Sequence, residues 1–168
     1  GIGLSYANSG PTHYATEDLA CLRSLPNAII YTASDPLSAK YIAEATYKTK
    51  GAKFIRLDRK LSKNFNRSIT LKEVFQGYRF LKKGNFKKVC IVSHGTIIKR
   101  AIDASEKINK KFHKNISIID LIRCKPFPLH LISELKKYDV IVSIDEQTFS
   151  GGLYSIISEN LKNKKIIN

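Results

Sequence analysis

Short apolar runs alternate with helix-like stretches along almost the whole chain. Runs with strand character lie at residues 28–32, 53–57, 88–93, 116–121, 140–144 and 165–167. Between them, apolar residues recur at helical spacing. Strands that are apolar at successive positions are typical of parallel sheets covered by helices on both faces. The alternation therefore predicts an α/β chain with a mostly parallel sheet.

The same pattern divides the chain into two α/β pieces. In the first piece, Asp35 is placed to cap a helix that has Pro36 at its first position. A polar stretch without sustained periodicity follows and is interpreted as a linker. The predicted organisation is a first domain over 1–60, a linker over 61–70 and a second domain over 71–168.

Some local structure can also be predicted. The first 15 residues are expected to form a loop, followed by a helix over 16–25 with Thr16 as its cap. The second domain is expected to open with a β-hairpin, made of a strand over 74–81, a turn at 82–85 and the strand at 88–93. Later helices are expected at 97–112, 129–137 and 153–161.

The chain is strongly basic, with 29 lysines and arginines against 14 acidic residues and a net charge of +15. Such a charge attracts nucleic acids, and it also attracts sugar phosphates. The lysines, however, occur as pairs spread along the sequence, at 82–83, 87–88 and 136–137 among others, and no aromatic–basic RNA-binding motif accompanies them. They are interpreted as solvated faces, and nucleic acid is not the expected partner.

Three cysteines, Cys21, Cys90 and Cys124, have neither disulfide nor metal-site spacing and are expected to be buried free thiols in a reducing cytoplasm. No apolar run approaches the roughly 18 residues of a membrane-spanning helix, and no signal peptide is visible. A cytoplasmic location is therefore expected. The chain begins Gly-Ile-Gly and contains no methionine, which suggests a fragment or a processed product.

One motif stands out near the N-terminus. Gly10-Pro-Thr-His13 precedes a predicted helix, followed by Glu-Asp-Leu at 17–19 and Leu-Arg-Ser-Leu-Pro-Asn at 22–27. With the lead-in at 3–7, this run resembles the second half of the pyrimidine-binding domain in the transketolase family of thiamine-diphosphate enzymes. It is most similar to the C-terminal subunit of split transketolases. Later segments, at 77–84, 120–127 and 145–152, resemble the family's C-terminal domain.

The resemblance implies part of a pyrimidine-binding α/β domain followed by a three-layer α/β/α domain. It also implies a transferase that moves a two-carbon ketol unit between sugar phosphates or related sugars, with thiamine diphosphate and Mg²⁺, together with an N-terminal subunit or domain and as a dimer. The family's cofactor-activating glutamate and its Gly-Asp-Gly motif are not among the 168 residues. This chain alone is therefore expected to hold no cofactor or metal and to be inactive.

Two residues are the site candidates. The resemblance implies that His13 lines the channel to the thiazolium carbon, binds oxygens of the donor sugar and assists proton transfer. It implies that Arg59, after the strand at 53–57, contacts the substrate phosphate, for which a guanidinium fork is suited. Arg56 is the competing candidate. Ser9 stands where transketolases commonly carry aspartate, a departure that bears on donor hydroxyl recognition and separates the chain from deoxyxylulose-phosphate synthases.

Other readings stay open. One is a non-catalytic assembly or regulatory module of the same fold, and another is a fragment of a deoxyxylulose-phosphate-synthase-like enzyme. Ser-His-Gly at 93–95 lacks the Gly-x-Ser-x-Gly context of a hydrolase, so His94 is expected to line a strand-end crevice without catalysing. Asp145 and Glu146 precede a Gly-Gly turn, but adjacent carboxylates point in different directions, and no metal is assigned. His113 and His130 are expected at the surface.

Overall fold

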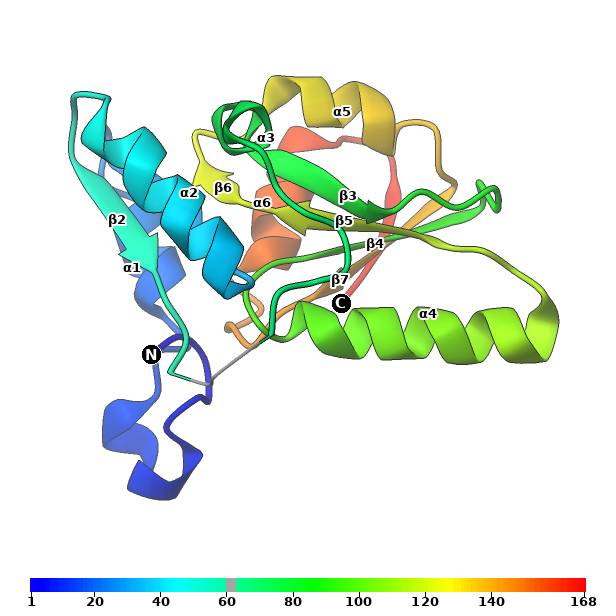
Figure 1. The fold of residues 1–168 in the computed structure, drawn as a ribbon, viewed down its shortest axis with the longest axis horizontal. Helices are drawn as coiled ribbons and strands as arrows, with labels where there is room; N and C mark the ends of the chain where they lie inside the picture. Colours follow the sequence, from blue (N-terminus) through cyan, green and yellow to red (C-terminus); the bar gives the residue numbers. More distant parts are fainter. Residues whose placement is uncertain (60–62) are drawn as a thin grey trace.

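The computed structural model describes residues 1–59 and 63–168. Its larger sheet has the strand order β3-β5-β4-β7-β8 (Figure 1). Four of these strands are mutually parallel, and β3 pairs antiparallel with β5. The strands are β3 (Tyr78–Lys82), β4 (Val89–Ser93), β5 (Ser117–Leu121), β7 (Val140–Ile144) and β8 (Lys165–Ile167).

A smaller sheet has the order β2-β1-β6. Strands β1 (Ile29–Thr32) and β2 (Lys53–Arg56) are parallel and are joined by α2 (Pro36–Tyr47), which confirms the predicted strand–helix–strand unit. Strand β6 (Arg123–Lys125) pairs antiparallel with β1, although it comes from the second half of the chain. This strand is not predicted from the sequence, and it ties the two halves of the chain together.

Helices cover both faces of the larger sheet. Helix α4 (Ile98–Phe112) lies on one face, and α5 (Leu129–Leu135) and α6 (Leu153–Asn160) lie on the other (Figure 1). Side chains of β4 alternate accordingly: Ile91 packs with the α4 side, and Cys90 and Val92 pack with the α5 and α6 side. The mostly parallel, three-layer α/β/α architecture is therefore confirmed.

The second domain does not open with a hairpin. Residues predicted as one strand divide into α3 (Leu71–Gln76) and β3, because Gly77 takes a left-handed φ of 91° that ends the helix. Thr70 and Glu73 form a capping box at the start of α3. Strand β5 lies between β3 and β4, so the predicted pairing of β3 with β4 is wrong. Arg79 of β3 faces Asp120 of β5 in register, and their ion pair supports this order.

In the first domain, one helix does not begin where it was predicted to begin. Helix α1 (Asp18–Arg23) is preceded by Glu17 and has no side-chain cap, so Thr16 is not its cap. Asp35, by contrast, accepts a hydrogen bond from the backbone N–H of Ser38 at 2.7 Å, and Pro36 is the first residue of α2, as predicted.

The predicted linker lies partly outside the described residues, at 61–62. Its described part packs on both domains. The backbone N–H of Leu37 donates to Asn64 at 2.9 Å, Phe65 packs in the cluster around α4, and Ile69 is buried beside α2.

Two of the three cysteines are buried as predicted, but Cys21 is exposed on the short helix α1, so that part of the prediction is wrong. Burial raises the pKa of the Cys124 thiol to about 11, and it also raises the pKa of Cys90. Within the ranges 1–59 and 63–168, no helix is both long and apolar enough to cross a membrane.

Candidate functional site

The structure brings His13 and Arg59 to the same aromatic ring. His13 ends a 3₁₀ turn over Pro11–His13, and its imidazole centroid lies 6.0 Å from that of Tyr6. The guanidinium carbon of Arg59 lies 4.7 Å from the Tyr6 centroid, within range of a cation–π contact. His13 and Arg59 are both exposed. The two candidates thus flank Tyr6 on one accessible surface.

Backbone contacts fix the N-terminal segment that carries this surface. Gly3 and Ala15 form an antiparallel bridge, and the N–H of Ile2 donates to the carbonyl of Leu57 at 3.3 Å. Gly10 adopts a φ of 77°, which a residue with a Cβ rarely adopts. The N-terminal segment, which includes the Gly-Pro-Thr-His motif, is thereby held against the carboxyl end of β2, just before Arg59.

Tyr6 was not predicted from the sequence as part of the site. The signal for it was its aromatic ring within the lead-in at 3–7.

Arg56 has a different environment. Its side chain is fully buried, and it donates to both carboxylate oxygens of Asp18, at 2.8 and 3.1 Å. It also donates to Thr32 Oγ1 at 3.3 Å. A guanidinium engaged in this way stabilises the contact of α1 with β2 and is not available to a ligand.

His94 lies next to Arg56, at the carboxyl end of β4. Its Nδ1 is 3.4 Å from Arg56 Nη1, and its Nε2 is 3.8 Å from Asp145 Oδ2. Burial lowers the pKa of His94, and the Arg56 charge acts the same way, although Asp145 opposes both. Asp145 Oδ2 also accepts from the N–H of Leu153 at 2.9 Å, at the start of α6. His94 is therefore a neutral, buried residue at a strand-end crevice, whereas His113 and His130 are exposed.

The buried His94 makes stability depend on pH. Its folded-state pKa lies below the ordinary value of 6.5, so the unfolded chain takes up the proton first as the pH falls. We expect the free energy of unfolding to fall between pH 7 and pH 5 by up to about 2 kcal/mol from this residue, at about 1.4 kcal/mol per pH unit below 6.5. Urea unfolding at the two pH values measures it.

The variant His94→Gln should reduce this pH dependence. The matched control is His130→Gln at an exposed position, which should keep the pH dependence of the original chain. An unchanged pH dependence in His94→Gln would show that another group causes it.

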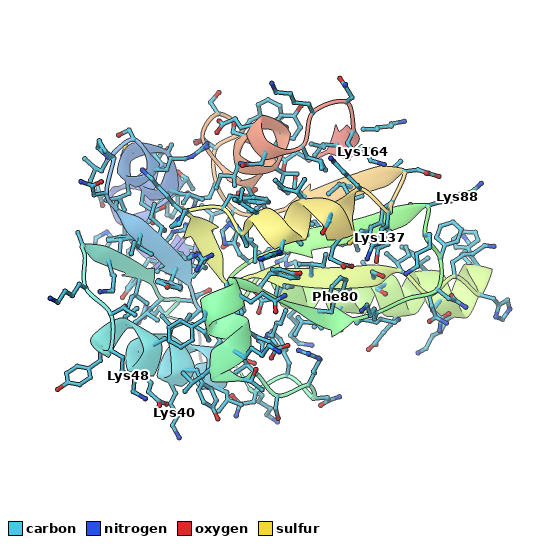
Figure 2. All side chains as sticks on the ribbon, turned by 90° about the horizontal axis from the view of Figure 1, so that it is seen from above. Lys40, Lys48, Phe80, Lys88, Lys137 and Lys164 are labelled. Carbon is cyan, nitrogen blue, oxygen red and sulfur yellow. The ribbon has the colours of Figure 1, made fainter. Side chains whose placement is uncertain are left out.

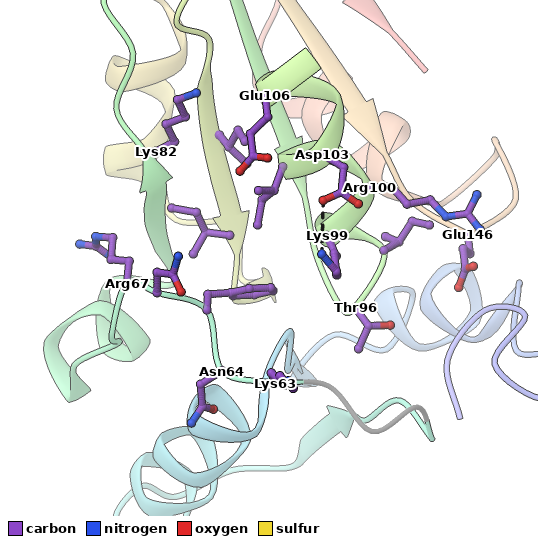
Figure 3. Close-up of a pocket in the computed structure, with 16 residues that line it drawn as sticks. Lys63, Asn64, Arg67, Lys82, Thr96, Lys99, Arg100, Asp103, Glu106 and Glu146 are labelled. Atoms are coloured by element: carbon purple, nitrogen blue, oxygen red, sulfur yellow. Dashed lines mark hydrogen bonds and ion pairs between the residues drawn. The ribbon is translucent and has the colours of Figure 1, made fainter. Parts of the chain in front are cut away.

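A wide cavity of about 830 Å³ lies between α4 and the described end of the linker (Figure 3). Its charged lining has both signs, and one pair, Lys99 Nζ and Asp103 Oδ1, is 3.3 Å apart. A second cavity of about 10 Å³ lies beside His94. Neither cavity is lined by His13 or Arg59.

In the ranges 1–59 and 63–168, no group of three His, Cys, Asp or Glu side chains is placed to hold a metal ion. The carboxylate of Asp145 already accepts from the first N–H of α6, so the Gly-Gly turn before that helix is not open to an anion.

The chain therefore has an α/β fold, and His13 and Arg59 lie near the same aromatic ring at the carboxyl end of β2. The family "Transketolase, C-terminal domain" matches residues 79–168. The chain belongs to the transketolase C-terminal domain family.

Relatives and solved structures agree with this assignment. The 1-deoxy-D-xylulose-5-phosphate synthase of Vibrio campbellii is 29% identical over 161 residues, which cover 94% of this chain and 24% of that protein. The synthase of Buchnera aphidicola is 28% identical over 162 residues, covering 95% and 26%. The chain thus spans about a quarter of the length of these relatives.

Solved structures show the same fold. A split-gene transketolase, described as an inactive beta4 tetramer, superposes with a TM-score of 0.82 at 24% identity, covering 99% of this chain and 53% of that one. The transketolase of Leishmania mexicana superposes with a TM-score of 0.77 at 17% identity, covering 88% and 22%.

Proposed function

We propose that this chain is part of a thiamine-diphosphate-dependent transketolase that transfers a two-carbon ketol unit between sugar phosphates or related sugars. The observation that carries the proposal is the joint contact of His13 and Arg59 with Tyr6, on the exposed surface of a chain of this family. Thiamine diphosphate with Mg²⁺ supplies the carbanion chemistry in the assembled enzyme. We expect a partner N-terminal subunit or domain to provide the site for both.

Within this proposal, the two exposed side chains have separate roles. The imidazole of His13 can donate to or accept from sugar oxygens near neutral pH, and can move a proton between them. Thr12 Oγ1 lies 3.0 Å from its Nδ1, so Nε2 is the nitrogen that is left to contact substrate. Arg59 supplies a positive charge and a planar fork for the substrate phosphate. Its stacking on Tyr6 sets the position of the fork.

A 1-deoxy-D-xylulose-5-phosphate-synthase-like enzyme is the second candidate. It is favoured by the synthases of Vibrio campbellii and Buchnera aphidicola, which align with nearly the whole chain. Ser9, which is exposed beside the Gly-Pro-Thr-His turn, differs from the aspartate expected in such synthases. The ketol transferase therefore stays our first proposal, and a non-catalytic module of this fold is the outcome if no activity is found.

One reconstitution tests the proposal. The chain is mixed with a separately expressed N-terminal transketolase part, and ketol transfer from a ketose phosphate to an aldose phosphate is followed. A parallel assay with pyruvate and glyceraldehyde 3-phosphate tests the synthase. We expect transfer in the first assay and none in the second. The reverse result would favour the synthase, and no turnover in either assay would favour the non-catalytic module.

The chain on its own is expected not to bind thiamine diphosphate. The reason is that its described residues include no metal-ligand cluster and that His13 and Arg59 line neither cavity. Calorimetric titration with thiamine diphosphate and Mg²⁺ should give no saturable heat for the chain alone. The same titration on the reconstituted pair is the positive control. Saturable binding by the chain alone would contradict this prediction.

We also propose a cytoplasmic location, a homodimeric assembly and the division into 1–60, a linker over 61–70 and 71–168. The division is supported by the two sheets, between which β6 is the strand that crosses the proposed boundary in the described residues, and by the family match that begins at residue 79.

A further inference from the structure

Lysines that are far apart in the sequence lie at one end of the larger sheet. Strands β4, β5, β7 and β8 are parallel, so the segments that precede them share one edge, and the antiparallel β3 ends at the same edge. Figure 2 shows Lys88, Lys137 and Lys164 on the half of the molecule away from α2. We call the segments 82–88, 107–116, 134–139 and 161–165 together the amino edge.

The amino edge carries most of the chain's net charge. Its 28 residues include thirteen lysines and two acidic residues, which gives a net charge of +11. The other 140 residues have a net charge of +4. A general excess of lysine in the sequence would spread the charge over all faces. The lysine pairs that are scattered in the sequence come together here, because each pair is next to the end of a strand at this edge.

Strand register places several of these lysines close together. Val89, Val140 and Lys165 occupy equivalent positions on three neighbouring strands. One residue earlier on each strand, Lys88 and Lys164 therefore flank Asp139, and their backbones are about 10 Å apart at the usual strand spacing.

Tyr138 organises two further contacts at this edge. Lys164 Nζ donates to the Tyr138 carbonyl at 2.5 Å, and Lys87 Nζ lies 5.4 Å from the centroid of its ring. The ring itself is buried, and its hydroxyl donates to Ser117 Oγ at 2.8 Å. The lysines on either side of Tyr138 thus extend from a rigid base.

Few of these charges are neutralised within the chain. Lys137 pairs with Glu134 at 2.7 Å, and in the part of the chain that the structure describes it is the one amino-edge lysine with a carboxylate partner. Asp139 is the other acidic residue there. Lys82 donates to Ser105 Oγ at 3.2 Å, Lys87 to the Gly84 carbonyl at 3.3 Å and Lys164 to the Tyr138 carbonyl, and these acceptors are neutral and leave the positive charges in place. The other amino-edge lysines are exposed.

We propose that the amino edge binds the phosphate backbone of a nucleic acid without reading its sequence. Lysines are compact charges that neutralise phosphates, and this surface contains no arginine for bidentate contacts to guanine. Interfaces with proteins are instead depleted in lysine and need an apolar centre, and Phe112 is the single strongly exposed large apolar residue of these segments. The charge therefore fits a polyphosphate chain better than an acidic protein.

The test is the binding of a fluorescent, mixed-sequence, 20-nucleotide RNA by the full chain, followed by anisotropy at 50 and 200 mM salt. Contact with about five phosphates weakens binding to a single strand on the order of 100-fold over this range. A scrambled sequence should bind equally well. Absence of binding at 50 mM salt, or affinity that does not change with salt, would overturn the proposal.

Two variants of equal charge separate the amino edge from the overall charge. The test variant is Lys88→Glu/Lys136→Glu/Lys165→Glu, and the control is Lys40→Glu/Lys50→Glu/Lys72→Glu; all six lysines are exposed. We expect the test variant to lose at least tenfold more affinity than the control. Equal losses would overturn the proposal. If circular dichroism shows that the test variant does not fold, a variant with glutamine at the same three positions replaces it. The glutamine variant should also weaken binding.

Two other anionic ligands test whether the amino edge prefers a partner of another class. Polyglutamate represents an acidic protein, and vesicles containing phosphatidylserine represent an anionic membrane. We expect each to bind at least tenfold more weakly than the RNA. Tighter binding to either of them would overturn the proposal in favour of that partner.

Discussion

Replacing Arg79 by alanine is expected to lower the free energy of unfolding by about 3–5 kcal/mol. Its side chain is fully buried between two carboxylates. Nε donates to Asp120 at 2.9 Å and Nη2 donates to Asp35 at 3.1 Å. Asp35 caps α2 and Asp120 lies on β5, so Arg79 joins the first domain to the larger sheet. Alanine would leave two buried acidic groups without their cation.

The two carboxylates respond differently to their surroundings. Burial raises the pKa of Asp120, and this effect exceeds the opposing effects of Arg79 and of the Ser34 hydroxyl. Burial also acts to raise the pKa of Asp35, but the Arg79 charge and hydrogen bonds from Ser38 and Phe65 outweigh it, and the pKa of Asp35 is lowered. Without Arg79 we expect Asp120 to be protonated in the folded state.

Urea unfolding followed by circular dichroism measures the loss. The control is Arg67→Ala, which removes an exposed arginine from its pair with Glu73 and should cost no more than about 1 kcal/mol. In the triple variant Arg79→Met/Asp35→Asn/Asp120→Asn, the charges are removed together, and we expect part of the stability to return. A loss in Arg79→Ala no larger than in Arg67→Ala would contradict the account.

The sequence predicts the strands of this fold better than their order. The runs at 140–144 and 165–167 coincide with β7 and β8, because apolar runs between turn residues determine where buried strands lie. The order β3-β5-β4 depends on the pairing of Arg79 with Asp120, 41 residues apart, which has no local signature. Strand β6 is only three residues long and is likewise defined by its partner β1.

The start and the end of α3 have local signals in the sequence. Thr70 and Glu73 have the capping-box spacing that signals a helix start, and Gly77 is placed to end a short helix. The apolar Val74 and Phe75 instead favoured a strand.

In the candidate site, the resemblance identified His13 and Arg59, but only the structure shows that both lie near the Tyr6 ring. It also shows that Arg56 is engaged by Asp18, which favours Arg59 as the arginine that is left for a ligand.

Replacing His13 by alanine is expected to lower kcat/KM for ketol transfer by about 10²–10⁴-fold in the reconstituted enzyme. The expected cause is the loss of the imidazole that binds the sugar oxygens and moves a proton between them. His13 is exposed and contacts Tyr6 and Thr12, so the stability of the chain should change little in the variant. Steady-state kinetics and thermal unfolding of the same preparations measure the two effects separately.

The matched control is His130→Ala, which removes another exposed histidine, on α5, and should leave kcat/KM unchanged.

Arg59→Ala should act differently from His13→Ala. It removes the charge that holds the phosphate, so KM should rise about 10–100-fold for phosphorylated substrates, and an unphosphorylated sugar should show little change. If His13→Ala kept full activity while Arg59→Ala lost it, the surface around Tyr6 would bind substrate, and proton transfer would have to be assigned to a residue of the partner part.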